Sequence, residues 1–163
     1  MLELSLLTTA DAEAIRRWPP YPPTFDQLDY ALREGGWLDQ FPAGAQTRRF
    51  GTREDSILVG FSLLTHITVA DAEFYIALHP QQIGHGIGRE ITQRTLQFGF
   101  DQLSLQRIYL KVRKWHQRGI ALYEGVGFKP CGEIVELIQG EPVPFLSMEI
   151  SPLRHTGTNP ANR

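Results

Sequence analysis

Residues 74–88 read Phe-Tyr-Ile-Ala-Leu-His-Pro-Gln-Gln-Ile-Gly-His-Gly-Ile-Gly, and this stretch decides the fold. The apolar run at its start predicts a strand, which Pro80 ends because proline has no N–H for a β-ladder. Glycines at 84, 86 and 88 predict a turn. Apolar residues on one helical face then predict a helix from Arg89 to about Gln102. The order is therefore strand, glycine turn, helix.

A glycine turn before a helix favours phosphate binding. The first N–H groups of a helix lack internal partners and carry partial positive charge, and glycine lets the backbone approach a ligand. A P-loop is excluded because Arg89-Glu90 follows the last glycine. The G-x-G-x-G spacing fits a dinucleotide fingerprint poorly. A coenzyme A pyrophosphate loop and a plain glycine-rich turn both remain open.

A second pattern lies downstream. Residues 107–112 alternate as in a strand, and residues 116–128 read His-Gln-Arg-Gly-Ile-Ala-Leu-Tyr-Glu-Gly-Val-Gly-Phe, a helix ending at glycine. Together, the glycine turn and this segment resemble the GNAT superfamily of N-acetyltransferases. That family has a [QR]-x-x-G-x-[GA] turn and, about thirty residues on, an N-x-x-A-x-x-L-Y-x-x-x-G-F segment. The resemblance covers roughly residues 57–150.

Three positions depart from the family pattern. The usual Arg or Gln falls on Ile83, although a shifted frame starting at Gln81 restores it. The family's Asn falls on His116, and its following Ala falls on Gly119. The chain's opening, a Leu-rich strand followed by Thr8-x-x-Asp11-Ala12, more weakly resembles the branch that contains ribosomal-protein alanine N-acetyltransferases.

The resemblance implies an α/β (α+β) fold. The expected sheet is mixed and mostly antiparallel, splayed at its centre and flanked by helices. We expect one acetyltransferase domain over residues 1–150 and a mobile C-terminal tail over 151–163. A strand over 46–52, a strand over 57–65 with a bulge or close approach at Gly60, and a last hairpin of strands over 131–138 and 145–150 around residues 139–142 fit this sheet. A helix starting at Thr24 or Asp26 and ending near Gly35 would flank it.

The resemblance also implies a coenzyme site for acetyl-CoA. The central strand and the glycine turn would bind pantetheine and pyrophosphate, and His116 would stand where the family has Asn. The side chain of His85 is also consistent with an exposed turn residue. The implied coenzyme contacts are Leu78, Ile83, Gly84, His85, Gly86, Ile87, Gly88, Arg89 and His116.

Two residues are the catalytic candidates. Tyr123 falls on the family's L-Y position, where a phenol could protonate the leaving thiolate; it could also simply pack under the sheet. Glu73 is the candidate base, because a carboxylate in a desolvated cleft can take up a proton through water. A solvent-exposed charge at a strand end fits Glu73 equally well. Strand alternation places Glu73, Tyr75 and Ala77 on one face.

The acceptor pocket is the least defined part of the sequence. Four prolines among residues 19–23 make a stiff connector, which is either a spacer or a rigid pocket wall. Because ligand clefts favour aromatic linings, the candidate substrate-binding residues are Trp18, Tyr21, Phe25 and Tyr75.

Composition limits the partners. The net charge of −2 implies no nucleic-acid partner. A single cysteine excludes an internal disulfide and fits a reducing compartment. We find no transmembrane stretch, no signal peptide and no metal-binding spacing of the five histidines. We therefore expect a cytoplasmic protein without metal or membrane attachment. The last strand and Phe145-Leu146 could pair in a homodimer.

The sequence thus predicts an acetyl-CoA-dependent N-acetyltransferase whose acceptor amine attacks directly in a ternary complex. The acceptor stays open between a protein N-terminus, a polyamine, an amino acid and an aminoglycoside. Two rivals remain. A non-catalytic acyl-CoA sensor of the same fold would keep the glycines without depending on Tyr123. A nucleotide-binding regulatory domain would leave the segment ending Gly127-Phe128 unexplained.

Overall fold

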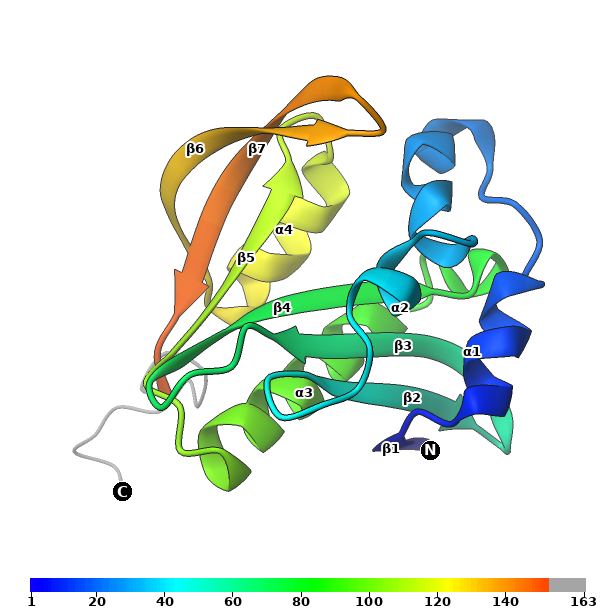
Figure 1. The fold of residues 1–163 in the computed structure, drawn as a ribbon, viewed down its shortest axis with the longest axis horizontal. Coiled ribbons are helices and arrows are strands. Elements are labelled where there is room, and N and C mark those ends of the chain that lie inside the picture. Colours follow the sequence, from blue (N-terminus) through cyan, green and yellow to red (C-terminus); the bar gives the residue numbers. More distant parts are fainter. Residues whose placement is uncertain (153–163) are drawn as a thin grey trace.

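The computed structural model describes residues 1–152 and contains one seven-stranded sheet with helices on both faces (Figure 1). The strands are β1 (Leu2–Leu6), β2 (Arg48–Glu54), β3 (Ile57–Thr65), β4 (Asp71–Leu78), β5 (Arg107–Arg113), β6 (Lys129–Ile138) and β7 (Glu141–Ile150). The helices are α1 (Thr9–Arg16), α2 (Trp37–Gln40), α3 (Ile87–Gln102), α4 (Gln117–Val126) and the 3₁₀ segments η1 (Pro23–Leu32) and η2 (Pro80–Gln82).

The sheet is splayed at its centre. Its strand order is β1-β2-β3-β4-β5-β7-β6, and only β4 and β5 run parallel. These two strands pair only from Asp71 with Arg107 to Glu73 with Tyr109. Beyond that point they diverge, as Figure 1 shows. The predicted fold class, a mixed and mostly antiparallel sheet that splays at the centre, is confirmed.

The two faces of the sheet carry different helices. Phe74 of β4 packs on one face in a core shared with α3, α4 and β5. Ala77 packs on the other face in a core shared with α1 and η1. The predicted alternation along β4 is therefore confirmed. Gly60 is a point of close approach, because a Cβ there would lie 2.8 Å from Cδ1 of Ile91 in α3.

Several element boundaries differ from the sequence prediction, among them that of β2, which begins at Arg48 rather than at residue 46. The helix expected from residue 24 or 26 is a 3₁₀ segment, interrupted by non-helical angles at Phe25 after two prolines. Helix α3 begins at Ile87 rather than Arg89, because the left-handed Gly86 is its N-cap. Strand β7 begins at Glu141, since positive φ angles at Gln139 and Gly140 make a tight turn directly after β6.

The single-domain prediction for 1–150 stays a prediction. Residues 153–163, most of the expected tail, lie outside the described residues. Within residues 1–152, no helix is long and apolar enough to cross a membrane.

Candidate active site

A cavity of about 490 Å³ opens where β4 and β5 diverge, and we call it the central cavity. The glycine turn lines one part of it and η1 another. From the strands it is lined by Ile76, Ala77, Leu78, Lys111, Val112, Arg113 and Phe145. Parting of the two strands therefore creates a space that reaches from the start of α3 across the sheet to η1.

The glycine turn exposes the start of α3. Gly84 and Gly86 have φ angles of +90° and +79°, values that side-chain-bearing residues rarely adopt. No side chain caps the helix at Gly86, so its first N–H groups lack a side-chain acceptor. Arg118 of α4 lies over the turn, since a Cβ on Gly84 would meet its Nη2 at 2.9 Å. Free N–H groups, the helix dipole and a guanidinium make an anion site.

The predicted coenzyme residues divide into two groups. Those that line the central cavity are Leu78, Ile83, Gly84, Gly86, Gly88, Arg89 and His116. His85 is exposed, and the side chain of Ile87 is buried against Ile91 in the core. Neither lines the cavity, so a side-chain contact of His85 or Ile87 with a ligand in the cavity finds no support, and only their backbone groups remain candidates.

His116 and Gly119, two of the three positions that depart from the family pattern, lie against each other. The ring of His116 lies against Gly119, where a Cβ would approach its Cδ2 at 2.5 Å. An alanine there would displace the imidazole, which also packs edge-on against Phe25 at a ring distance of 5.6 Å. Burial, assisted by the nearby Arg118 and Arg113, lowers the pKa of His116. The imidazole is therefore neutral at pH 7.

Tyr123 lines the central cavity. Its ring packs edge-on against Phe74 and Phe128. Burial raises the pKa of Tyr123, so the phenol stays protonated at neutral pH. Among the contacts within residues 1–152 we find no hydrogen bond for this hydroxyl, which leaves it free for a ligand.

The predicted acceptor aromatics lie in different places. Tyr21 and Phe25 line the central cavity, and the Tyr21 hydroxyl donates to the Leu78 carbonyl at 2.7 Å. Trp18 lines neither of the two cavities described here, and its substrate-binding role stays a prediction. It is 8% exposed and packs against Phe61 and His79 in the core.

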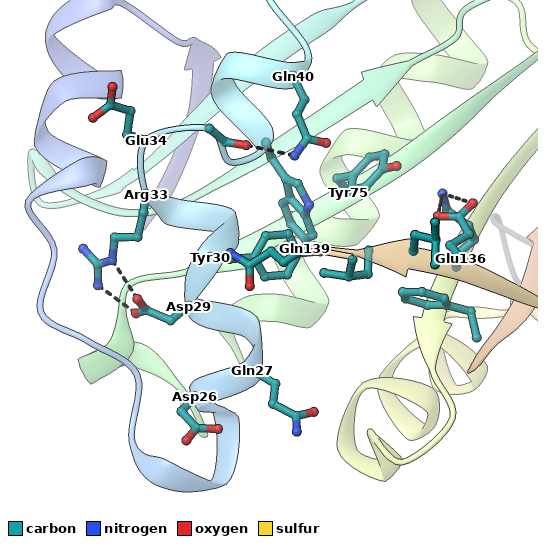
Figure 2. Close-up of a pocket in the computed structure, with 16 residues that line it drawn as sticks. Asp26, Gln27, Asp29, Tyr30, Arg33, Glu34, Gln40, Tyr75, Glu136 and Gln139 are labelled. Atoms are coloured by element: carbon teal, nitrogen blue, oxygen red, sulfur yellow. Dashed lines mark hydrogen bonds and ion pairs between the residues drawn. The ribbon is translucent and has the colours of Figure 1, made fainter. Parts of the chain in front are cut away.

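A second cavity, of about 530 Å³, lies between η1 and the β6–β7 hairpin, and we call it the η1 cavity (Figure 2). It shares Tyr30, Trp37, Lys111 and Phe145 with the central cavity, so the two adjoin at these residues. Its other lining residues are Asp26, Gln27, Asp29, Arg33, Glu34, Gly35, Gln40, Tyr75, Glu136, Leu137, Ile138 and Gln139.

Glu73 and Lys111 form a charge network beside the η1 cavity. Lys111 Nζ lies 3.2 Å from Glu73 Oε2 and 3.0 Å from Glu136 Oε1. Burial alone would lower the pKa of Lys111, but the two carboxylates outweigh it and raise that pKa. Glu73 is 4% exposed and lines neither cavity. Tyr75 connects it to the η1 cavity, since the Tyr75 hydroxyl donates to Glu73 Oε1 at 3.2 Å.

The sequence reasoning missed several lining residues. Lys111 and Arg113 could have been found, because alternation along 107–113 puts both on the strand face opposite Ile108, Leu110 and Val112. No local signal identified Gln27 and Tyr30 of η1, Trp37 of α2 and Glu136 of the hairpin, since the placement of these lining residues depends on packing across the sheet. Within residues 1–152 no group of three or more His, Cys, Asp or Glu side chains could hold a metal ion.

The fold and site together define an acetyltransferase architecture. Residues 3–129 match the acetyltransferase (GNAT) domain family, and this is most of the chain. The protein therefore belongs to the GNAT family.

Spermidine acetyltransferases are among its relatives. Spermidine N(1)-acetyltransferase of Vibrio cholerae serotype O1 is 38% identical over 65 residues, which cover 40% of this chain and 38% of that protein. The Escherichia coli K12 enzyme of the same name is 31% identical over 90 residues, 54% of this chain and 48% of that protein. The matched segments thus span less than half the length of these curated relatives.

Solved structures of this kind match over nearly the whole chain. A chimera of Vibrio cholerae spermidine N-acetyltransferase SpeG and hSSAT has a TM-score of 0.78 at 26% identity, covering 96% of this chain and 99% of that one. The Vibrio cholerae enzyme in complex with CoA and spermine has a TM-score of 0.75 at 25% identity, covering 95% and 98%. These relatives are spermidine acetyltransferases, not members of the ribosomal-protein alanine branch that the opening segment resembles.

Proposed function

We propose that the protein transfers an acetyl group from acetyl-CoA to a primary amine of a small molecule, with polyamines as the first acceptor class to test. One observation carries the proposal. A cavity between the diverging β4 and β5 has an anion site at one end and a free phenol in its wall, and it adjoins a second cavity lined by carboxylates.

The glycine turn would bind the coenzyme's pyrophosphate. The N–H groups at the start of α3 carry partial positive charge, and Arg118 lies over Gly84. Pantetheine would follow the open edge of β4, where the backbone from Ile76 to Leu78 lines the cavity. The carbonyl of Leu78 already accepts a hydrogen bond from Tyr21. Backbone N–H groups of this stretch are therefore the candidate donors to the thioester carbonyl.

Tyr123 would act as the general acid. The amine nitrogen forms a bond to the acetyl carbon, the C–S bond breaks, and the thiolate takes the proton of the Tyr123 hydroxyl. The phenolate regains its proton from solvent. A hydroxyl that is protonated and free of internal partners suits this role.

Glu73 would receive the proton that the amine loses. It lines neither cavity, so we propose that the Tyr75 hydroxyl connects it to the acceptor. That hydroxyl lines the η1 cavity and donates to Glu73. It can accept a proton from the amine while passing its own to the carboxylate. Burial and the Glu73 charge raise the pKa of Tyr75, so the phenol is present in its protonated form.

The acceptor would enter through the η1 cavity. Asp26, Asp29, Glu34 and Glu136 line it. Asp29 and Glu136 are paired with Arg33 and Lys111 of the same cavity, so Asp26 and Glu34 supply the excess negative charge that favours a cationic acceptor. The named acceptor of the relatives, spermidine, and the spermine of the solved complex belong to this class. The case for a protein N-terminus, the acceptor of the ribosomal-protein branch, rests on the resemblance of the opening segment alone.

A coupled assay tests the proposal. Purified protein is incubated with acetyl-CoA and a panel of spermidine, spermine, putrescine, amino acids and an aminoglycoside. Free thiol is followed by absorbance, and the acetylated amine is identified by its 42 Da mass increase. We expect amine-dependent thiol release. Tight acetyl-CoA binding without thiol release for any amine would support the acyl-CoA sensor instead. Absence of acetyl-CoA binding would reject both the acetyltransferase and the sensor.

A further inference from the structure

Arg113, at the end of β5, is a buried cation at the boundary of the two cavities. It is 7% exposed and lines the central cavity. Its guanidinium lies over the rings of Tyr30 and Phe145, at 5.7 and 5.9 Å from their centroids. Both rings also line the η1 cavity. Arg113 is therefore buried beside residues that both cavities share.

Within residues 1–152 no carboxylate neutralises Arg113. Five other arginines of residues 1–152 form ion pairs: Arg16 with Asp39, Arg33 with Asp29, Arg53 with Asp11, Arg94 with Glu90, and Arg107 with Glu149. The single hydrogen bond from Arg113 goes to Gln27 Oε1 at a long 3.3 Å. A guanidinium has five N–H donors, and burying its charge without an anion is costly. The aromatic rings offset only part of that cost.

The donors of Arg113 that make no hydrogen bond keep some accessible surface. Among residues 1–152, the side-chain atoms that are fully enclosed and make no hydrogen bond belong to Arg49, Thr52 and Thr65. No nitrogen of Arg113 is one of these atoms. Because Arg113 lines the central cavity, we take this accessible surface to open into that cavity. The donors can therefore reach a ligand.

The coenzyme's pyrophosphate is not the expected partner. The proposed pyrophosphate site uses Gly84, Gly86 and Arg118, on the turn before α3 and on α4. Arg113 instead contacts Gln27 and Tyr30 of η1 and Phe145 of β7. These residues line the η1 cavity, through which the acceptor would enter. The unneutralised charge is thus on the acceptor side.

We propose that Arg113 is an anion subsite for the acceptor, and that the enzyme therefore takes amines that also carry a carboxylate. This inference rests on the proposed function and narrows its acceptor class. A planar guanidinium matches a carboxylate in a two-point contact. A diamino acid would satisfy both features of the site, with one amine held by the carboxylates of the η1 cavity and its carboxylate on Arg113. Spermidine, which has no anionic group, leaves Arg113 unneutralised.

Matched acceptors test the subsite. Ornithine and putrescine differ only in the α-carboxylate, and so do lysine and cadaverine. In wild type we expect a higher kcat/KM for the amino acid of each pair. In Arg113→Gln the ratio of kcat/KM between ornithine and putrescine should fall about 10- to 100-fold, the range expected for loss of a charge-assisted contact. Arg107→Gln, the same change on the same strand but outside both cavities, should keep the wild-type ratio.

The controls separate this inference from the proposed function. An unchanged ratio in Arg113→Gln, or a wild type that prefers both diamines, overturns the anion subsite while leaving acetyl transfer intact. A tenfold loss of acetyl-CoA affinity in Arg113→Gln with an unchanged ratio would assign Arg113 to the coenzyme and also overturn it. Failure to acetylate any amine, in protein that binds acetyl-CoA, would reject the proposed function itself.

Discussion

At the scale of single residues, the polar groups that the fold leaves without internal partners are the ones available for chemistry. Tyr123 and Arg113 line the central cavity; among residues 1–152 the Tyr123 hydroxyl makes no hydrogen bond and the Arg113 guanidinium makes one. Glu73 differs, because Lys111 and Tyr75 already contact its carboxylate. His66 is a third neighbour, with its Nε2 3.7 Å from Glu73 Oε1, and proton transfer to Glu73 would pass through one of these groups. This difference leads to separate predictions for the acid and the base.

Tyr123→Phe removes the proposed acid and little else. We expect kcat to fall about 100-fold, in the range of general acid–base effects, with acetyl-CoA affinity retained. Tyr109→Phe is the matched control, since Tyr109 lies on β5 and lines neither cavity. Burial raises the pKa of Tyr123 above the ordinary value of 10.0. Wild-type activity should therefore show no loss from phenol ionisation up to that pH. An unchanged kcat in Tyr123→Phe would remove this residue from the mechanism.

Glu73→Gln tests the base by its dependence on pH. We expect kcat/KM to fall about 100-fold at pH 7, where a typical acceptor amine is protonated. The defect should shrink toward pH 10, because the amine then loses its proton to water without help. Glu133→Gln, at an exposed ion pair with Lys114, is the control. A defect of constant size across this pH range would indicate that Glu73 serves only to hold Lys111.

At the scale of elements, local residue choices account for the termini of helices α1 and α3. Thr8 caps α1, and its hydroxyl and the Asp11 carboxylate form a reciprocal capping box. Asp11 also contacts Arg53 of β2, so this cap joins the helix to the sheet. Left-handed Gly86 begins α3 and leaves its N-terminal N–H groups open. The α1 terminus therefore contributes to stability, and the α3 terminus is the proposed pyrophosphate site.

Asp11→Asn should destabilise the protein in a pH-dependent way. Burial would raise the pKa of Asp11, but Arg53 and Thr8 outweigh it and lower that pKa. A carboxylate with a lowered folded-state pKa stabilises above its unfolded value, here 3.8, and loses that contribution as pH falls through the folded-state pKa. Urea unfolding should show a deficit of about 1 kcal/mol at pH 7 that narrows toward pH 2.

The exposed Glu13 of α1 provides the control for that experiment. Glu13→Gln should stay within about 0.5 kcal/mol of wild type at both pH values. An Asp11→Asn deficit that persists undiminished at pH 2 would contradict the ion-pair explanation.

How far the sequence predicts each element depends on whether its signal is local. The glycine turn and the β4 alternation carry local signals, so the strand–turn–helix order and the two faces of β4 were predicted. Trp18 looked like a pocket aromatic but is a core residue, because its position depends on the distant Phe61. The η1 cavity joins elements far apart in the chain, and no short window of sequence encodes it.

At the scale of the whole molecule, the parting of β4 and β5 creates the cavity, and the far edge of the sheet is left unpaired. Strand β6 ends the strand order and carries the exposed Val135 and Leu137. The expectation that Phe145 offers a dimer surface is corrected, since it is buried and lines both cavities. A long unpaired edge with exposed apolar residues favours association. We therefore propose β6 as the contact surface of the predicted homodimer.

Val135→Lys tests that edge. We expect wild type to run as a dimer in light scattering and Val135→Lys to run as a monomer, because the charge would be desolvated in the interface. Ile57→Lys is the control, with an exposure of 66% against 67% for Val135 but a place on β3. A wild-type monomer at tens of micromolar would reject the dimer.

The coenzyme site is the central claim, and calorimetric titration with acetyl-CoA on wild type, Gly86→Asn and Gly86→Asp tests it most directly. Asn and Asp both tolerate the left-handed angles of Gly86 and differ mainly in charge. A carboxylate beside the start of α3 would favour the helix but repel a pyrophosphate. We predict binding to wild type and at least tenfold weaker binding to Gly86→Asp than to Gly86→Asn. Equal affinities for the two variants, or no binding to folded wild type, would contradict the account.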